Sequence, residues 1–568
     1  MFPRRNVCPP AFRIRVSASP ELLLGPMLRH VSTTSATIWL EADSSCVVEV
    51  LGRTTRTFCV EGHHYALVVI EGLAEGSSTP YQVHLDGHQR WPLPESTLPP
   101  SVIRTLGSGP LRVLFGSCRT AAPHEPPWSL ELAHDPRGRG VDAIRAHALR
   151  MLGQPSETWP HLIVMLGDQI YADDSSPVTR ARVRERRTGA EDEPPVDRVA
   201  DFEEYTWLYH ESWSPEVERW FFSVVPSAMI FDDHDMIDDW NISDTWVRDT
   251  RRLPWWQTHV IGGLVSYWIY QHLGNLSPEE IREEGMLDAI SRVDDGGPLL
   301  REWAAQSEEY TPLPGGYRFS YVRDLGRVRL VVVDCRNGRV LEPGHRSMLD
   351  SDEAAWVAEQ CHADVDHLLI AASLPVFVTG ALHDLQVWNE AICDGAWQRP
   401  GAWLGERLRR ALDLEDWPAF IRSFEWLVGL LGDLGSGRDG PAPATISVLS
   451  GDIHFSYVAA VHFPEHLGVT SHVHQLVSSP IRNALVPRER AAIRFALSRT
   501  GKWIARGLRR CARRHHTEIT WEMTHGPIFT NVLGGATFDG REARVLIEQA
   551  HATDEGEPEL VVVIDSRL

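Results

Sequence analysis

Apolar residues along the chain fall into two patterns that predict two kinds of element. Some runs are apolar at nearly every position, which is typical of strands buried on both faces of a sheet. Other stretches repeat apolar residues at helical spacing. Because the two kinds alternate, they indicate an α/β domain built on a largely parallel or mixed sheet. The predicted strands are 111–116, 162–166, 225–231, 317–321, 328–333, 368–371 and 446–449, and the predicted helices are 142–152, 202–222, 255–273, 277–293 and 352–361.

The first hundred residues have a different pattern. After a Pro/Arg-rich tail (1–20), five or more short β segments alternate with Ser/Thr/Gly turns, and Asp86-Gly87 is a hairpin signal. This pattern predicts a small β-sandwich of fibronectin III type over residues 21–106, joined by a linker (92–108) to a second domain over 107–568. Three further strands, predicted at 529–533, 543–548 and 560–565, close the chain.

Three segments of the second domain depart from the strand–helix alternation. Residues 175–199 are polar and charged with Pro near both ends, so we expect a mobile surface insertion. Residues 383–440 are Trp-rich and partly helical, and form a second insertion. Residues 486–514 form a basic helical segment. Its part 502–514 is typical of a solvated helix face, and a membrane-surface or anionic-substrate role is the alternative.

Charge and cysteine content narrow the class of protein. The 568 residues include 55 Lys+Arg and 77 Asp+Glu, a net charge of −22, which argues against a nucleic-acid binder. No apolar run is long enough to span a bilayer, and Arg4-Arg5 is followed by no apolar export segment. The eight cysteines form no C-x-x-C pair, so most are expected to be free buried thiols of a cytoplasmic protein.

Polar residues recur where the predicted buried strands end. Because the carboxyl ends of parallel strands meet at one edge of a sheet, these residues are expected to converge. Taken singly, each has a plainer interpretation: Gly167-Asp168 as a strand-to-turn junction, Cys118 as a buried thiol, and the six acidic residues of 232–244 as a solvated loop. The strand-end residues are Cys118, Asp168, Tyr171, Asp232, Asp233, His234, Asp334, Asp452 and His454.

The chemistry of this set favours cations. Carboxylates and imidazoles predominate, with one possible thiolate and one possible phenolate, which suits a site for several cations better than a structural zinc. Two close cations suit in-line displacement at phosphorus, because one makes a hydroxide nucleophilic and both neutralise charge on the phosphate oxygens. Arg119 or Arg336 could bind the substrate phosphate in a bidentate manner.

Six short motifs follow one another along the chain: Phe115-Gly-Ser-Cys118, Gly167-Asp-Gln-Ile-Tyr-Ala-Asp173, Phe231-Asp-Asp-His-Asp235 with Asp238-Asp-Trp-Asn241, Asp334-Cys-Arg336, Ser373-Leu-Pro375 and Ser450-Gly-Asp-Ile-His454. As an ordered set they resemble the PhoD-like alkaline phosphatases, a branch of the metallophosphoesterase (calcineurin-like) fold. The resemblance implies an α/β (α+β) metallophosphoesterase sandwich, with mixed sheets flanked by helices and a small β-sandwich in front.

The same resemblance implies residue roles and cofactors. Members of the family hydrolyse phosphomonoesters and phosphodiesters with Fe³⁺ and Ca²⁺, and other divalent metals are an alternative. His234 would steady the transition state or protonate the leaving oxygen. Asp232, Asp173, Asn241 and Asp334 would be additional ligands or would support the ligands. The implied metal ligands are Cys118, Asp168, Tyr171, Asp233, Asp452 and His454.

The sequence therefore predicts a hydrolase of phosphoric esters in which a metal-bound hydroxide attacks phosphorus directly, without a phosphoenzyme. The substrate class stays open among monoesters, diesters and phospholipids, and so does the oligomeric state. The rival hypothesis is a non-catalytic metal-binding or interaction protein on the same scaffold. His234, beside a full set of ligands, favours the enzyme.

Overall fold

A computed structural model of the chain describes residues 19–310, 317–438, 440–512 and 517–568. Of the predicted tail 1–20, all but the last two residues lie outside this range. Arg513 and Arg514 of the basic segment lie outside it too. Within the described residues, no helix combines the length and apolarity needed to cross a bilayer.

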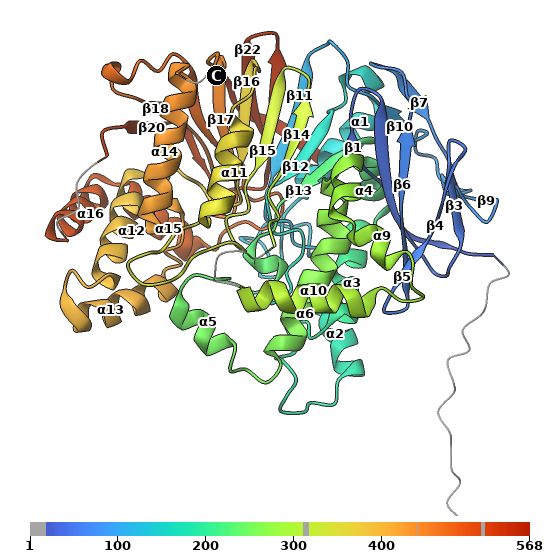
Figure 1. Cartoon of the computed structure of the whole chain (residues 1–568), viewed down its shortest axis with the longest axis horizontal. Coiled ribbons are helices and arrows are strands. Elements are labelled where there is room, and N and C mark those ends of the chain that lie inside the picture. Colours follow the sequence, from blue (N-terminus) through green and yellow to red (C-terminus); the bar gives the residue numbers. More distant parts are fainter. Residues whose placement is uncertain (1–18, 311–316, 439, 513–516) are drawn as a thin grey trace, which may run out of the picture.

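The N-terminal strands form two small sheets that face each other (Figure 1, blue). Their shared core contains Ile38 and Leu40 from one sheet and Val48, Val83 and Leu85 from the other. A short pair, β7 (Ser78–Pro80) and β10 (Val102–Arg104), lies beside them. In order across each sheet, the strands are β1 (Leu22–Val31), β2 (Ser35–Ala42), β6 (His63–Glu71) and β5 (Phe58–Val60), and β4 (Arg53–Arg56), β3 (Val47–Val50), β8 (Val83–Leu85) and β9 (His88–Trp91).

Two mixed sheets form the centre of the molecule, one of six strands and one of seven. In the first, β11, β12 and β13 are parallel and the three C-terminal strands are antiparallel. In the second, β15, β16, β17 and β19 are parallel. The strand orders are β13 (Ser227–Met229), β12 (Leu162–Met165), β11 (Leu111–Gly116), β21 (Val532–Asp539), β22 (Glu542–Ala552) and β23 (Pro558–Arg567), and β14 (Tyr321–Leu325), β15 (Val328–Val332), β16 (His367–Ala371), β17 (Thr445–Ser450), β19 (His472–Val477), β18 (Ser456–His462) and β20 (Thr520–Ile528).

Strand β12 shows why its sequence is apolar throughout. Leu162 and Val164 lie in the core between the two sheets, in one cluster with Leu330 of the opposite sheet. Ile163 and Met165 point the other way, into the core under the helices. Both faces of the strand are therefore buried, as the uninterrupted apolar run predicts.

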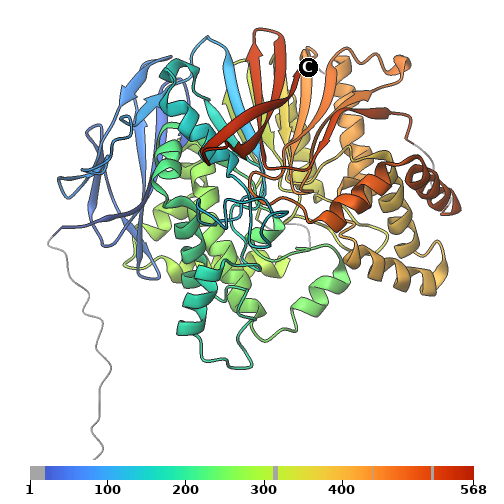
Figure 2. The same cartoon turned by 180° about the vertical axis from the view of Figure 1, so that it is seen from behind.

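Helices cover the outer faces of both sheets, and the N-terminal sandwich lies at one end of the molecule with α12, α13 and α16 at the other (Figures 1 and 2). Side chains of Asp142, Ser176, Asp201 and Ser277 cap the first turns of four of them. The α-helices are α1 (Ala143–Leu152), α2 (Pro177–Arg186), α3 (Phe202–Trp213), α4 (Glu216–Val224), α5 (Asp244–Thr250), α6 (Trp256–Tyr267), α7 (Leu273–Asn275), α8 (Pro278–Glu284), α9 (Met286–Ile290), α10 (Gly297–Tyr310), α11 (Ser351–Cys361), α12 (Gly380–Cys393), α13 (Gln398–Ala411), α14 (Ile421–Ser436), α15 (Pro487–Leu497) and α16 (Arg499–Cys511).

Several bounds differ from the sequence prediction. The strand predicted at 317–321 begins at Tyr321, because it forms a hairpin with β15 that turns at Gly326 (φ +75°). The strand predicted at 529–533 runs instead over 532–539, where β11 supplies its partner. Pairing, and not local apolarity, sets both bounds. The segment 175–199 contains α2, whose Val183 is fully buried.

The sandwich is fixed to the rest of the molecule by buried polar contacts. Arg29 of β1 donates hydrogen bonds to the carbonyls of Tyr270 (2.7 Å) and Gln271 (2.6 Å). Glu41 of β2 accepts hydrogen bonds from Tyr270 (3.0 Å) and His210 (2.7 Å), and its second oxygen lies 3.1 Å from His63. Buried groups left without these partners would be costly, so the contacts specify how the two parts fit together.

Candidate metal centre

The polar residues predicted at the strand ends converge where the two sheets meet. Cys118, Asp168 and the segment 232–234 follow β11, β12 and β13 of one sheet. Asp334 and Asp452 follow β15 and β17 of the other, and His454 lies two residues beyond Asp452. Parallel strands of both sheets thus deliver their carboxyl ends to the same place.

The backbone is unusual at these positions. Cys118, Asp168, Asp452 and His454 have positive φ angles of 58°, 53°, 63° and 55°. Side chains rarely adopt this left-handed conformation, and non-glycine examples cluster at functional sites. The chain therefore turns sharply after each strand, with one of these side chains at the turn.

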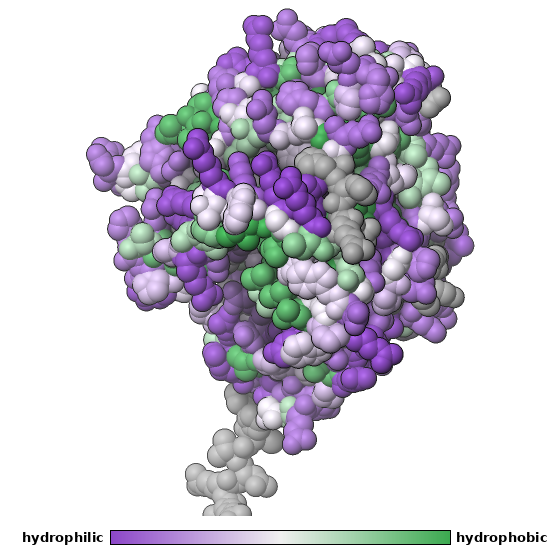
Figure 3. Space-filling view, turned by 90° about the vertical axis from the view of Figure 1, so that its left-hand side faces the viewer, coloured by the Kyte–Doolittle hydropathy of each residue, from purple (hydrophilic) through white to green (hydrophobic). Residues whose placement is uncertain are grey.

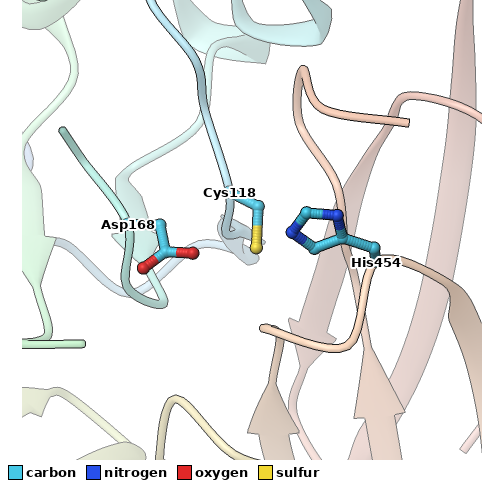
Figure 4. Close-up of side chains that lie close together, drawn as sticks. All are labelled: Cys118, Asp168 and His454. Atoms are coloured by element: carbon cyan, nitrogen blue, oxygen red, sulfur yellow. The ribbon is translucent and has the colours of Figure 1, made fainter. Parts of the chain in front are cut away.

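Three of these side chains form the first cation-sized group. One ligand atom each from Cys118, Asp168 and His454 lie within 4.8 Å of one another. Figure 4 shows the thiol between the carboxylate and the imidazole, on loops from three different strands. Burial lowers the pKa of His454 to about 4. The ring is therefore neutral at neutral pH, the form that binds metals.

Asp168 belongs to two further groups whose ligand atoms are close enough together to hold a cation. It lies with Asp233 and His234 in one, and with Asp232, Asp233 and Asp452 in the other. Ligand atoms in each group again fall within 4.8 Å of one another. All three groups therefore share Asp168.

The carboxylates of this centre lack enough positive partners. Oδ1 of Asp168 and Oδ2 of Asp232 are buried and accept no hydrogen bond from the described residues. Burial, with the charges of Asp232 and Asp233, raises the pKa of Asp168 well above its usual range. Burial raises the pKa of Asp232 to about 6, although the positive charge of Arg336 acts to lower it. Bound cations would relieve both the burial cost and the mutual repulsion.

His234 is oriented by a carboxylate. Its Nδ1 lies 2.8 Å from Oδ1 of Asp173, and Oδ2 of Asp173 accepts a hydrogen bond from the Asp238 amide (2.7 Å). Burial lowers the pKa of His234, but the charges of Asp173 and Asp168 outweigh it and raise the pKa well above its usual value. The side chain of His234 is 22% exposed, so solvent reaches it from outside.

Tyr171 lies beside the same group. Its hydroxyl donates to Oδ2 of Asp168 (3.4 Å) and accepts a hydrogen bond from the Asn483 amide (2.9 Å). Its ring lies 4.6 Å from that of His234, measured between centroids. Burial and the nearby Cys118 and Asp168 raise its pKa well above the usual range.

Arg336 lies among the carboxylates of this centre. The side chain is fully buried, and Nε lies 2.6 Å from Asp232. Its other nitrogens lie 3.1 Å from Asp233, 2.7 Å from Glu415 and 3.5 Å from Asp452. Its donors are thus committed to protein carboxylates, which it holds in place. Glu415 had no local sequence signal, because it comes from the segment 383–440.

Arg119 is likewise committed to the protein. Its Nε donates to Asp142 (2.8 Å), and Nη1 donates to the backbone and side-chain oxygens of Ser212 (both 2.9 Å). Asp142 and Glu218 also approach His124 within metal-ligand spacing. Glu218 lies 2.8 Å from His124, 3.2 Å from Arg145 and 3.8 Å from Arg119, so this group is an ion-pair network.

Asn241 and Asp334 shape the loop that carries Arg336. Nδ2 of Asn241 donates a hydrogen bond to the carbonyl of Arg336 (3.2 Å). Oδ1 of Asp334 accepts hydrogen bonds from the backbone N–H groups of Arg336 and Asn337 (both 2.9 Å). Asp334 belongs to none of the cation-sized groups of the described residues. Asn241 and Asp334 therefore hold the backbone of the loop that positions Arg336.

Two serines support the thiol, and sequence reasoning missed both. The hydroxyl of Ser479 donates to Sγ of Cys118 (3.2 Å) and accepts the His454 backbone N–H (3.2 Å). Ser117 lies 3.1 Å from the same sulfur through Oγ, which accepts the Asp452 backbone N–H (2.9 Å). Ser479 follows strand β19, so the strand-end signal that identified the other residues applied to it as well.

The donor set fits transition or alkaline-earth cations. Thiolate, phenolate and imidazole suit a first-row metal such as iron, and carboxylate oxygens suit calcium. Cys118 and His454 form one group with the shared Asp168, and the Tyr171 hydroxyl donates a hydrogen bond to Asp168. Asp232, Asp233 and Asp452 supply the oxygens of the other group.

Comparison with solved structures includes a match over nearly the whole chain. The structure titled "Structure of PhoD" covers 98% of this chain and 90% of its own, with a TM-score of 0.51 and 11% sequence identity. The chain has a PhoD-like fold. The match confirms a mixed α/β fold like that of PhoD, and the low identity limits the likeness to the fold.

The N-terminal sandwich has a separate match. The model of a domain of unknown function (DUF7800) matches residues 19–103, the region of the two small sheets. No curated protein matches the sequence.

Proposed function

We propose that this protein is a metal-dependent hydrolase of phosphoric esters, acting on monoesters or diesters by direct attack of water-derived hydroxide at phosphorus. The observation that carries the proposal is the place of Asp168 in three overlapping cation-sized groups. One carboxylate shared between two adjacent cation positions is the arrangement that in-line phosphoryl transfer uses. The PhoD-like fold supports the same class of reaction.

The proposed ligands are Cys118, Asp168, Tyr171, Asp233, Asp452 and His454, for Fe³⁺ and Ca²⁺. Bound cations would supply a nucleophile from water at neutral pH and neutralise charge on the phosphate oxygens. Asp232 and Arg336 hold the oxygen ligands at the correct spacing, since Arg336 contacts both Asp233 and Asp452.

His234 is the proposed catalytic side chain. Asp173 fixes the ring through Nδ1, and Nε2 has no hydrogen-bond partner among the described residues. The ring adjoins the Asp168–Asp233 group. It is therefore placed to stabilise the charge on the departing oxygen and to donate the proton that this oxygen takes.

The test is turnover of p-nitrophenyl phosphate and bis-p-nitrophenyl phosphate by protein of known metal content, with and without a chelator. We expect turnover that the chelator removes and added metal restores. The variant His234→Gln should keep its metal and lose most turnover. Failure of the metal-loaded protein to hydrolyse any member of a broad phosphate-ester panel would favour a non-catalytic metal-binding protein.

The iron assignment has its own test. A phenolate bound to Fe³⁺ gives a visible charge-transfer band, so we expect a coloured protein whose band disappears in Tyr171→Phe. Elemental analysis of both proteins should still find iron, because the other ligands remain. A colourless protein that contains only zinc would contradict the assignment.

A further inference from the structure

The hairpin of helices α15 and α16 carries a local charge opposite to that of the whole molecule. Between Pro487 and Cys511 there are eight basic residues and one acidic residue. The complete chain has a net charge of −22. A basic segment on an acidic protein localises any attraction to anions to this one face.

The exposed side of α16 combines cations with large apolar side chains. Trp503 is 77% exposed. Arg499 precedes it by four residues, and Arg506 and Arg510 follow it by three and seven, so all four lie on one face of α16. Ile504 and, on α15, Phe495 are also exposed, at 42% and 56%. Figure 3 looks onto this end of the molecule and shows a band of hydrophobic groups bordered by hydrophilic ones.

The opposite side of α16 fixes the helix to the protein. Ala505 is buried, Leu508 packs in a cluster with Trp388 of α12, and Arg509 lies 2.8 Å from Asp384. The outward face therefore has no part in holding the helix in place. Among the described residues, Arg499, Lys502, Arg506 and Arg510 form no ion pair, so their charges stay available.

A cavity opens beside the outward face. It has a volume of about 330 Å³, and Phe377, Tyr457, Leu497 and Trp521 line it together with Lys502. Lys502 also borders a second, smaller hollow with Arg506 and His383. Lys502 thus lies beside aromatic and aliphatic side chains in a cavity that Glu522 also lines, so the cavity offers one cation together with apolar contacts.

We infer that α15 and α16 form a docking surface for membranes that contain anionic phospholipids. Trp503, Ile504 and Phe495 enter the interfacial layer, and the arginines contact lipid phosphates, as in amphipathic helices that lie on a bilayer. Nucleic acid would use the cations but would leave the aliphatic Ile504 without a partner. The acidic remainder of the protein is repelled, so only this face approaches the lipid.

Vesicle binding by the full chain tests the surface. We expect co-sedimentation with vesicles of equal parts dioleoylphosphatidylcholine and dioleoylphosphatidylglycerol, weakened by salt, and none with dioleoylphosphatidylcholine alone. The variants Trp503→Ala and Arg506→Glu should each weaken binding by about tenfold. Arg184→Glu and Val178→Ala, on the basic helix α2, are matched controls that should bind like the parent. Thermal unfolding of each variant shows that it is folded.

Lys502 provides an independent readout, since it is the only lysine of the chain. An amine-acylating reagent followed by peptide mass spectrometry should modify Lys502 in the free protein. Vesicles with dioleoylphosphatidylglycerol should protect it, and pure dioleoylphosphatidylcholine vesicles should not. Equal modification in all three samples, or vesicle binding that the α2 and α16 variants affect alike, would overturn the inference. So would duplex DNA binding lost in Arg506→Glu without any vesicle binding.

Discussion

At the scale of single residues, the candidate metal centre depends on groups that orient the proposed ligands as much as on those ligands. The Ser479 hydroxyl contacts both the Cys118 thiol and the His454 backbone, and so joins two proposed ligands that follow strands β11 and β17. Partners of this kind fix the direction of a ligand and tune its basicity. Asp173 and Arg336 act in the same way on His234 and on the carboxylates.

We predict that Ser479→Ala weakens metal binding by roughly 10- to 100-fold while the fold is kept. The neighbour Ser478→Ala is the matched control, because the Ser478 hydroxyl is buried and has no hydrogen-bond partner among the described residues. Titration of the apoprotein with iron, followed by elemental analysis, measures the difference. Equal metal affinity in the two variants would contradict the role given to Ser479.

Asp168→Asn should have a larger effect than any other ligand substitution. The amide keeps the shape and removes the charge that both cation positions share, so metal should be lost from both. His454→Gln is the comparison, because it belongs to only one group. Metal content per chain, measured after dialysis, should fall further in Asp168→Asn. A protein that loses one metal position in both variants would show that Asp168 does not bridge.

At the scale of elements, the sequence predicted the strand ends because a strand buried on both faces is apolar without interruption. That pattern located Cys118, Asp168, Asp233 and His454. It could not show that Arg336 faces Glu415, because that pair is set by how the helical segment 383–440 folds over the site. It also could not place the ends of β14 and β21, which depend on partner strands.

Helix α1 provides a prediction about acid stability. His147 on its buried face accepts a hydrogen bond from Arg150 (2.9 Å), and burial lowers its pKa to about 3. The unfolded chain binds the proton near the ordinary pKa of 6.5 and the folded protein does not. His147 therefore stabilises the fold above pH 6.5, and that contribution is lost as the pH falls towards 3, by about 1.4 kcal/mol per pH unit.

Urea unfolding over that pH range measures the effect. His147→Gln keeps the acceptor and removes the proton-binding group, so its stability should decline less steeply with acid than that of the parent. His134→Gln, at an exposed loop position, is the control and should follow the parent. Parallel curves for all three proteins would contradict the prediction.

At the scale of the whole molecule, the sandwich and the two central sheets are joined through charged groups. His63 of β6 lies 3.1 Å from Glu41 in the sandwich and 2.8 Å from Glu203 of α3. Burial lowers the pKa of His63, but the two carboxylates outweigh it and raise the pKa to about 9. A protonated imidazole thus links the two parts at neutral pH.

We predict that this link weakens in alkali. Because the folded pKa lies above the unfolded value of 6.5, the contribution of His63 is complete below pH 6.5 and is lost as the pH rises through about 9. Denaturant unfolding across this range should show the parent losing stability relative to His63→Gln. His88→Gln, at an exposed hairpin position of the same sandwich, should behave like the parent. No difference between parent and His63→Gln at any pH would contradict the link.

The positive φ angles at Cys118, Asp168, Asp452 and His454 lower the stability of the fold, and the proposed activity requires the side chains at these positions. Glycine adopts this conformation without steric cost, so a chain selected only for robustness would carry glycine at these four turns. This chain instead bears the energetic penalty four times in a small volume. Stripping the side chains away should yield an inert protein that resists denaturation better than its parent, and the increase would measure what the molecule gives up in order to work.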